Sequence, residues 1–590
     1  MRRRRLLRRL AAAWAVAALL LLVFAGFAAV SGRAALQRAR QQTAVGDLAS
    51  GRPRTALRHA ARDLTRAHDL LGSPVLWPIR IVPGVERQWR TARDLSGAGA
   101  IIARSTETAA SHAQGLLSDQ EAAGAGPARA ALLRRAGAAA AALRTDLDTV
   151  HLGPRGWLVP PLAGARNRAG ADLAEARVTL ARAKTASDQG ARFLDGPGHW
   201  LVLAANNAEM RSGSGTFLSV GVIEVADGHL HLDRFQSVTE VPVPVGAVPL
   251  EGDLRDRWEF LHPNREWRNL MVSPRFGVSA ALAARMWAAT GHPPVDGVIA
   301  VDLVGLRAAL AATGPQQMGP GYTARADQIL EDLMLRQYAF AERIGADDQA
   351  RRDGLAAVAS AVFGGVEAGG YRLSALADEL AAASRGRHLL AWSADDAAEA
   401  GWTAAGIDGT VPGNGLMLGI LNRGGNKLDQ FLVTRAHVAV GSPRRSANSG
   451  SGSRASAVER EVTVTVDLEN TTPDGAPGYV TGPPPDLAYV RGTYVGIATL
   501  TLPGDATAGS IDGADRLAVI GPDGPTGVIG VEVSLPQGAA QKIVFRFRLA
   551  GATGGLVVLP SARVPGVGWS VSGTSDDSSW TDQTSHSLTW

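Results

Sequence analysis

The chain has 590 residues, 46% of them hydrophobic and 19% charged, and it has no cysteine, which excludes disulfide bonds, thiolate metal sites and cysteine nucleophiles. Six arginines within the first nine residues contribute to the net charge of +5, and without those six the rest of the chain carries −1. This distribution excludes a basic, nucleic-acid-binding body. At about 150 residues per domain, the length predicts about four structural units.

The N-terminus has the pattern of a membrane anchor. After the basic residues 1–9, Leu10–Val30 is an uncharged apolar run that would span about 30 Å as a helix, the thickness of a bilayer core. The preceding arginines predict a cytoplasmic N-terminus and an extracytoplasmic body. A cleaved signal peptide is the alternative, because Ala28–Ser31 offers small residues to a peptidase, but the run is longer than the usual apolar core of about 7–15 residues. We therefore predict a single-pass protein of the cytoplasmic membrane.

Residues 31–195 have the periodicity of a helical, membrane-proximal region. Apolar side chains recur at spacings of three and four along Leu57–Leu71, as in a helix packed on a partner. Ser73–Gly84 is rich in proline and is predicted to be extended. No motif in this region indicates chemistry, so a spacer, or a stalk through which the chain forms a homo-oligomer, is the favoured interpretation. Further helices are predicted over residues 88–117, 128–150 and 162–193.

Residues 196–440 are predicted to form a mixed α/β domain, because strand patterns alternate with helical ones. Gly215–Ala226 is predicted to be a strand that turns at Asp227-Gly228 into a second strand. Asp302 is predicted to cap a helix that begins at Leu303 and ends before Gly314. Helices are also predicted over residues 279–290, 324–344, 348–363 and 373–384, and strands over 200–205, 298–301, 389–392 and 416–421.

The last part of the chain has a different composition. Residues 441–456 are polar and low in complexity, which predicts a flexible linker or loop. Apolar and polar residues then alternate along Val462–Leu468, and residues 457–569 are predicted to form an all-β, sandwich-like domain. Residues 570–590 are predicted to be a polar tail. The predicted fold class is therefore multidomain α+β, with one transmembrane helix, a helical stalk, a mixed α/β domain and a β-sandwich-like domain.

Polar side chains gather directly after the apolar strand at 200–205. Arg211 is suited to binding a phosphate with two hydrogen bonds, and the glycines at 213 and 215 would let backbone N–H groups approach the anion. The alternative is structural: the two asparagines complete a turn and Glu209 pairs with Arg211. Lys427, one of only three lysines in the chain, lies in a polar loop that would either border a site or form a hairpin turn. The candidate ligand-binding residues are Asn206, Asn207, Glu209, Arg211 and Lys427.

One further cluster resembles a metal site. His229, His231 and Asp233 lie on one face of a predicted strand, a spacing that can hold a metal ion. An exposed polar strand face next to a turn is the simpler interpretation. The sequence has neither a Gly-x-Ser-x-Gly nor a His-Glu-x-x-His motif, so hydrolase and metalloprotease functions have no support.

Five segments of the chain carry a family resemblance: Ser73–Gly84, Asn206–Arg211 with its following glycines, Pro294–Asp302, Thr313–Pro315 and Asn422–Lys427. Together they resemble an uncharacterised family of membrane-anchored bacterial proteins, domain of unknown function 4012. The resemblance covers about residues 60–480 and implies an envelope protein, but it implies no activity.

The segment from Asp296 to Leu306 also resembles the strand–helix unit of the LytR–CpsA–Psr family. That family transfers glycopolymers from polyprenyl-pyrophosphate carriers to the cell wall, with arginines on the pyrophosphate and aspartates on Mg²⁺. The resemblance places Arg211 at the family's Arg-Ser-Asp motif, where this chain has Gly213 in place of the metal-binding aspartate. It leaves Asp296 and Asp302 as the candidate Mg²⁺ ligands.

Two functions follow from these patterns. The favoured one is a membrane-anchored extracytoplasmic protein with an accessory or ligand-binding role in cell-envelope glycopolymer assembly, whose partner is a cell-wall glycan or a lipid-linked carrier. The alternative is a phosphotransferase that moves glycopolymer from a polyprenyl-pyrophosphate carrier to the wall. Mg²⁺ is implied by the alternative only, and enzymatic activity stays open.

Overall fold

The computed structural model describes two compact units. The helical unit comprises Met1–Arg192 with Arg372–Asp378, and the second unit comprises Phe193–Tyr371 with Glu379–Trp590. The multidomain α+β class is therefore confirmed. The structure describes residues 21–33, 52–118, 126–344, 348–445 and 458–590, apart from positions 23, 27, 83, 234, 320, 321, 485, 552 and 576.

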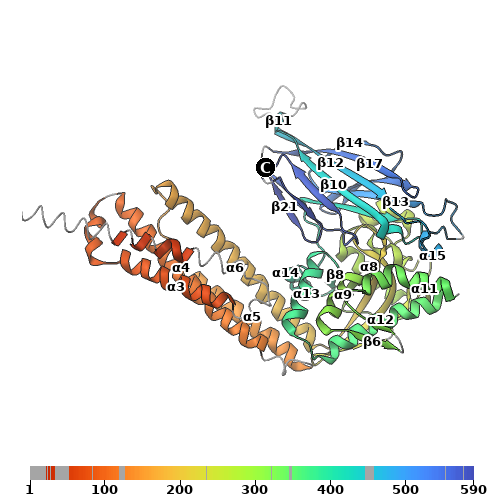
Figure 1. Cartoon of the computed structure of the whole chain (residues 1–590), viewed down its shortest axis with the longest axis horizontal. Helices are drawn as coiled ribbons and strands as arrows, with labels where there is room; N and C mark the ends of the chain where they lie inside the picture. Colours follow the sequence, from red (N-terminus) through yellow and green to blue (C-terminus); the bar gives the residue numbers. More distant parts are fainter. Residues whose placement is uncertain are drawn as a thin grey trace, which may run out of the picture. The chain divides into compact units, whose positions relative to one another are not determined.

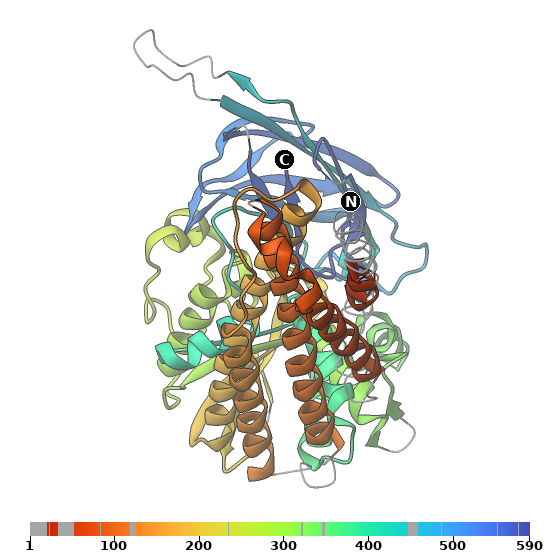
Figure 2. The same ribbon diagram turned by 90° about the vertical axis from the view of Figure 1, so that its left-hand side faces the viewer.

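The helical unit contains long helices that run side by side in Figures 1 and 2. The apolar positions of the predicted Leu57–Leu71 stripe are buried, and small residues bring two of the helices close together: a Cβ on Gly99 would lie 2.8 Å from Cδ1 of Leu64. Stripes of this kind hold helices together through apolar burial. The helices are α3 (Arg52–Leu71), α4 (Val85–Ser118), α5 (Pro127–Asp148) and α6 (Pro160–Asp195), of which the last three residues of α6 belong to the second unit.

The prediction that Ser73–Gly84 is extended is wrong. Pro74–Ile81 forms the 3₁₀ helix η1, which starts where the backbone N–H of Leu76 donates to the carbonyl of Ser73. Proline does not prevent this conformation, because its fixed φ near −65° suits a 3₁₀ helix.

Part of the predicted membrane span lies in the helical unit. Leu10–Leu20 lie outside the described residues, and the described residues of 21–33 are helical. Ala25 is buried in a cluster with Leu71, Leu76 and Trp89. In the part of the chain that the structure describes, no helix is long and apolar enough to cross a membrane.

The second unit begins with a mixed sheet in the order β3-β2-β1-β5-β8. Alternate residues of β1 are buried on its two faces: Leu201 and Leu203 pack with α8, whereas Trp200 and Val202 pack with α12 and α14. The two faces are therefore both covered by helices. The elements are β1 (Gly198–Met210), β2 (Gly215–Ala226), β3 (His229–Leu232), β4 (Gln236–Ser237), η3 (Val238–Glu240), α7 (Gly252–Trp258), η4 (Glu259–Leu261), η5 (Trp267–Val272), α8 (Phe276–Ala289), β5 (Gly297–Asp302), α9 (Leu303–Thr313), α12 (Asp348–Ala368), α13 (Leu373–Arg385), β8 (Leu389–Ser393) and α14 (Asp396–Ala405). The residues of α13 up to Asp378 belong to the helical unit.

Local sequence signals in this region are confirmed. Asp227 and Gly228 have φ values of 51° and 79°, as a tight hairpin turn requires, and Asp302 caps α9 with its side chain. The single helix predicted over residues 324–344 is wrong, because helical structure begins only at Ile329 and then contains a π-helical turn. A short hairpin of β6 (Gln316–Gly319) and β7 (Tyr322–Ala324) precedes it, and the helical part consists of α10 (Ile329–Glu331), the π-helical turn η6 (Asp332–Arg336) and α11 (Gln337–Ile344).

Two further sheets, of seven and six strands, enclose one hydrophobic core in the C-terminal part of the second unit. Their orders are β14-β17-β12-β10-β19-β20, with β11 beside β12, and β15-β16-β13-β9-β18-β21. The predicted alternation at Val462–Leu468 is confirmed, because its apolar members face the shared core. The elements, drawn from cyan to blue in Figure 1, are β9 (Gly415–Asn422), η7 (Leu428–Phe431), β10 (Leu432–Val440), β11 (Arg444–Arg445), β12 (Val458–Asn470), α15 (Gly478–Thr481), β13 (Tyr494–Pro503), β14 (Thr507–Asp512), β15 (Leu517–Asp523), β16 (Thr526–Leu535), β17 (Ala540–Ala550), β18 (Gly555–Val558), β19 (Gly568–Ser572), β20 (Ser579–Thr581) and β21 (His586–Thr589).

Strands β9 and β10 lie within these two sheets, although the sequence analysis grouped them with the α/β domain. β9 pairs with β13 and β18, and β10 pairs with β12 and β19.

Residues 570–590 are also paired rather than forming a free tail. The buried Asp582 accepts hydrogen bonds from Ser561 and from the backbone N–H of Val567. The polar composition of this segment therefore includes structural hydrogen bonds and not only solvent-exposed side chains.

Candidate functional site

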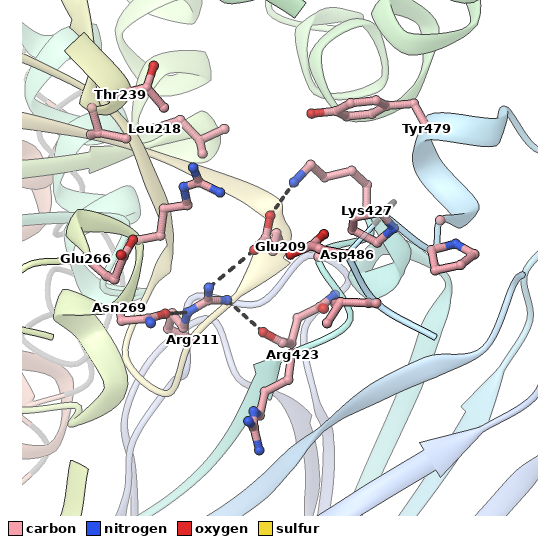
Figure 3. Close-up of a pocket in the computed structure, with 18 of the residues that line it drawn as sticks. Glu209, Arg211, Leu218, Thr239, Glu266, Asn269, Arg423, Lys427, Tyr479 and Asp486 are labelled. Carbon is pink, nitrogen blue, oxygen red and sulfur yellow. Dashed lines mark hydrogen bonds and ion pairs between the residues drawn. The ribbon is translucent and has the colours of Figure 1, made fainter. Parts of the chain in front are cut away.

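A pocket of about 610 Å³ lies in the second unit where the end of β1 meets β9 and η7. Its size is in the range of pockets that hold small ligands. Figure 3 shows Glu209 between Lys427 and Arg211, with Tyr479 above Lys427. The charged lining residues are Glu209, Arg211, Glu266, Arg268, Arg423, Lys427 and Asp486, and the others include Thr239, Asn269, Asn422 and Tyr479.

The end of β1 brings Glu209 and Arg211 to this place. β1 pairs with β5 only as far as Ala205, and its pairing with β2 is irregular between Asn206 and Met210. The backbone N–H of Met210 instead donates to Asp429 at 2.9 Å. The end of β1 therefore separates from β5, while Met210 still pairs with Gly215 of β2 and is also held by Asp429 of η7.

Glu209 forms the centre of a buried triad of charges. Its Oε2 accepts from Nζ of Lys427, and its Oε1 lies 3.3 Å from Nη2 of Arg211. The three side chains are at most 8% exposed. Charges buried to this degree persist in proteins when they are paired.

The pKa values in the triad follow from burial and charge together. Burial raises the pKa of the Glu209 carboxyl, but Lys427 and Arg211 outweigh that effect and bring it to about 2. Burial lowers the pKa of Lys427, but Glu209 outweighs that effect and raises it above its ordinary value. Glu209 is therefore ionised and Lys427 protonated at neutral pH, and both act as fixed charges rather than as proton donors or acceptors.

Arg211 is already bound by the protein on most of its donor groups. Its Nε donates to Oδ1 of Asn269 at 2.9 Å, and its Nη1 donates to the carbonyls of Met210 and Asn422, both at 2.9 Å. With the contact to Glu209, four of the five N–H donors of the guanidinium are used. Arg211 therefore holds β1 to η5 and β9, and it leaves one donor for a ligand.

The glycine-rich loop after Arg211 serves close packing. A Cβ on Gly213 would lie 2.8 Å from Cα of Pro274, and one on Gly419 of β9 would lie 2.8 Å from Cα of Ser212. The backbone N–H of Gly213 donates to the carbonyl of Met271. A Cβ on Gly215 would lie 2.4 Å from the carbonyl oxygen of Asn206. The expectation that Gly213 and Gly215 expose N–H groups to an anion therefore differs from the structure, in which neighbouring segments occupy that space.

A second buried ion pair supports the loop that carries Lys427. Asp429 and Arg563 are fully buried, and Oδ1 of Asp429 lies 2.7 Å from Nη1 of Arg563. Asp429 also accepts from Nδ2 of Asn422 and from the hydroxyl of Tyr494. This pair joins the ends of β9 and β13 to the segment after β18, directly behind the triad.

Two cationic side chains of the pocket are exposed. Arg423 places its guanidinium 5.9 Å from the ring centre of Phe260. Arg268 contributes to lowering the pKa of Glu209, and the structure gives it no ion pair and no side-chain hydrogen bond with any described residue. Arg268 is therefore a cation that faces the pocket without a carboxylate of its own.

The asparagines of the predicted site lie elsewhere. Asn206 donates to the hydroxyl of Tyr338, and Asn207 donates to Asp302 and accepts from the backbone N–H of Leu303. Both asparagines are almost completely buried and neither lines the pocket. They hold the end of β1 and the start of α9, so their role is structural and they do not bind a ligand in the pocket.

The candidate metal ligands have protein partners. Asp296 accepts from the backbone N–H of His199 at 2.7 Å, and Asp302 accepts from two N–H groups of α9 and lies 2.6 Å from Nδ1 of His388. Among the described residues no group of three or more histidine, aspartate or glutamate side chains could hold a metal ion, and this includes the His229–Asp233 strand face.

Several pocket residues were not identified from the sequence. Arg423 lies in the polar loop Asn422–Lys427, next to the candidate Lys427. Its positive charge in that loop could have identified it as a further candidate for binding an anion. Arg268 and Asn269 lie in the local sequence Trp-Arg-Asn-Leu, which matches no binding motif. Tyr479 and Asp486 lie in a stretch rich in glycine and proline, a composition typical of loops, which carry many binding residues.

The comparisons with known proteins identify one family. Residues 195–338 match the family described as "Protein of unknown function (DUF4012)", so the resemblance seen in the sequence is confirmed over that segment. The segment includes Glu209, Arg211 and Arg268 but ends before Arg423 and Lys427. No curated protein and no solved structure matches the chain.

Proposed function

We propose that this chain is a membrane-anchored, extracytoplasmic protein whose pocket binds a hydroxyl-rich ligand with one anionic group, such as the phosphorylated saccharide of an envelope glycopolymer or of its lipid-linked carrier. The observation that carries the proposal is Arg268, an exposed cation that faces the pocket and has no ion pair among the described residues. Such a group suits a charge-assisted hydrogen bond to phosphate or carboxylate.

The overall charge of the pocket supports a monoanionic group. Four cationic and three acidic side chains line it, which gives a net charge of +1 when all are ionised. The carboxylates and amides offer acceptors for sugar hydroxyls, and the half-exposed ring of Tyr479 offers an apolar face. One phosphate on a saccharide would balance the charge and use both kinds of group.

Binding fits the pocket better than transfer. Glu209 is too weak a base and Lys427 too weak an acid to move protons at neutral pH, because each stabilises the charge of the other. The transferase alternative also needs ligands for Mg²⁺, whereas Asp296 and Asp302 are engaged by backbone and side-chain donors. An accessory role in glycopolymer assembly is therefore the function that we propose.

The anchor completes the proposal. Leu10–Val30 carries no charge and follows six arginines, which favours an N-terminus in the cytoplasm and the remaining chain outside it. A body without cysteine is compatible with export, since its sheets are held by large apolar cores.

The test is a binding titration by calorimetry with the full chain in detergent. The probes are a sugar 1-phosphate, the neutral sugar and inorganic phosphate. Arg268→Ala is expected to weaken sugar-phosphate binding at least about tenfold, because it removes a charge-assisted hydrogen bond. Arg307→Ala removes an exposed arginine of α9 and is the matched control.

A second variant separates the two parts of the ligand. Tyr479→Ala should weaken the binding of the sugar phosphate and leave the affinity for inorganic phosphate unchanged. Equal affinities for the Arg268→Ala and Arg307→Ala variants, or no binding of any probe by the wild-type chain, would remove the support for the proposal.

A further inference from the structure

One end of the helical unit carries exposed, large apolar side chains. Trp77 is 61% and Trp157 87% exposed, and Ile81, Val82, Val85 and Val159 are also exposed. We call these six residues the apolar tip. Along the described parts of α4, α5 and α6, Val85 and Val178 are the only exposed large hydrophobic residues. On these three helices, exposed apolar surface is thus concentrated at the tip, as at sites that contact a membrane or another protein, and the helix of 21–33 adds the exposed Leu22, Phe24 and Val30.

The two loops of the tip are held together. Nε2 of Gln88 donates to the carbonyl of Trp157 at 2.6 Å, and its Oε1 accepts from the backbone N–H of Val159 at 3.0 Å. These bonds fix the segment before α6 to the first turn of α4, beside Val82 and Val85. Trp157 is held at a φ of 59°, which is unusual for a bulky residue and is often found at functional positions.

The N-terminal segment enters the helical unit at this same end. Leu21 and Ala25 pack in the cluster of Leu71, Leu76 and Trp89, which borders η1. Further along, Ser31 donates to Asp63 at 2.6 Å, eight residues before the end of α3. The helix of 21–33 therefore runs away from the tip, and its first described residue, Leu21, lies at the tip.

Leu10–Leu20 is too short to cross a bilayer without the residues that follow it. Leu10–Leu20 is 11 residues, which as a helix would measure about 16 Å, whereas the hydrocarbon core of a bilayer is about 30 Å thick. The rest of the span must come from Leu21–Val30, and the structure packs Ala25 and Ala28 of that stretch on protein. A span by this run is therefore possible only if the end of the bundle that contacts it lies at the membrane.

We infer that the apolar tip is a membrane-contacting surface that enters the outer leaflet of the bilayer. Tryptophan suits such a position because its ring is apolar while its N–H binds water or headgroups at the interfacial layer. The exposed Arg87 and Arg155 beside the tip suit contacts with lipid phosphates. This inference rests on the anchor of the proposed function.

The experiment uses the absence of native cysteine, which lets a single introduced cysteine carry a fluorophore. The full chain is reconstituted in vesicles of phosphatidylcholine and phosphatidylglycerol and labelled with an environment-sensitive dye at Trp77→Cys or Trp157→Cys. Val178→Cys is the matched control, because it is an exposed apolar residue of α6 about 27 Å along the helix from Pro160. Lipids with nitroxide-labelled chains should quench the two tip positions at least twofold more than the control.

The outcomes separate the two proposals. If the protein stays with the vesicles in alkaline carbonate but all three positions are equally unquenched, the anchor holds and the tip inference is wrong. If carbonate releases the protein, the anchor itself is wrong and the tip inference fails with it. Ile81→Cys repeats the measurement at a second tip position in case one tryptophan variant folds poorly.

Discussion

The pocket and the apolar tip are both exceptional surfaces, but they are built in opposite ways. The pocket joins charged side chains from segments more than 200 residues apart, and its central groups are buried and paired. The tip joins two short loops of one helical unit, and its tryptophans make little contact with the protein. Substitutions in the pocket should therefore cost folding free energy, whereas substitutions in the tip should mainly change the interaction with the environment.

The largest effect is expected from Lys427→Met. The substitution leaves Glu209 ionised and buried with only Arg211 as a close partner, which should lower the free energy of unfolding of the second unit by about 3–5 kcal/mol. Hydrogen exchange measured by mass spectrometry in urea can follow peptides of this unit separately. Lys542→Met removes an exposed pair with Asp467 and should cost about 0–1 kcal/mol. Equal losses of unfolding free energy in the two variants would contradict a stabilising role of Lys427 in the buried triad.

A smaller effect concerns pH. The folded Glu209 carboxyl, with a pKa of about 2, binds a proton less readily than the unfolded one at about 4.5, so acidification favours unfolding. Its stabilising contribution is present above pH 4.5 and is lost as the pH falls towards 2, by at most about 3 kcal/mol. The stability of the wild-type chain should therefore decrease more steeply over this range than that of Glu209→Gln. Parallel profiles would show that the cations do not act on this carboxyl.

The smallest effect on folding is expected at the tip. Trp157→Ser should change the free energy of unfolding of the helical unit by at most about 0.5 kcal/mol, because the ring is almost fully exposed. The same peptide-resolved exchange measurement applies. A cost above 2 kcal/mol would mean that the ring packs on protein, and the contrast between tip and pocket would then disappear.

Features set by neighbouring residues could be predicted from the sequence. The Asp227-Gly228 turn and the Asp302 cap depend on local φ values and on hydrogen bonds within a few residues. The long helices were predicted for the same reason, since their apolar stripes repeat within one segment. The π-helical turn Asp332–Arg336 was not predicted, because it changes the helical period without requiring a distinctive residue type.

The partners of the site residues could not be predicted, since they come from far along the chain. Asn269 and Asn422, which bind Arg211, are 58 and 211 residues away from it. Asn207 was interpreted as a ligand residue because it is polar and follows a strand, yet its partners are Asp302 and the start of α9. Pocket and scaffold residues of the same chemical type become distinguishable only when their contacts are known.

The pairing of β9 and β10 also limits how the chain can be shortened. The polar residues 441–456 look like a convenient place to end a soluble fragment. A fragment ending there would keep β9 and β10 but remove β12, β13, β18 and β19, the strands that bond them on both sides. The remaining apolar strands would present unpaired N–H and C=O groups to other molecules, which promotes aggregation. The part of this polar segment after β11 is better suited to carrying an inserted tag than to ending a fragment.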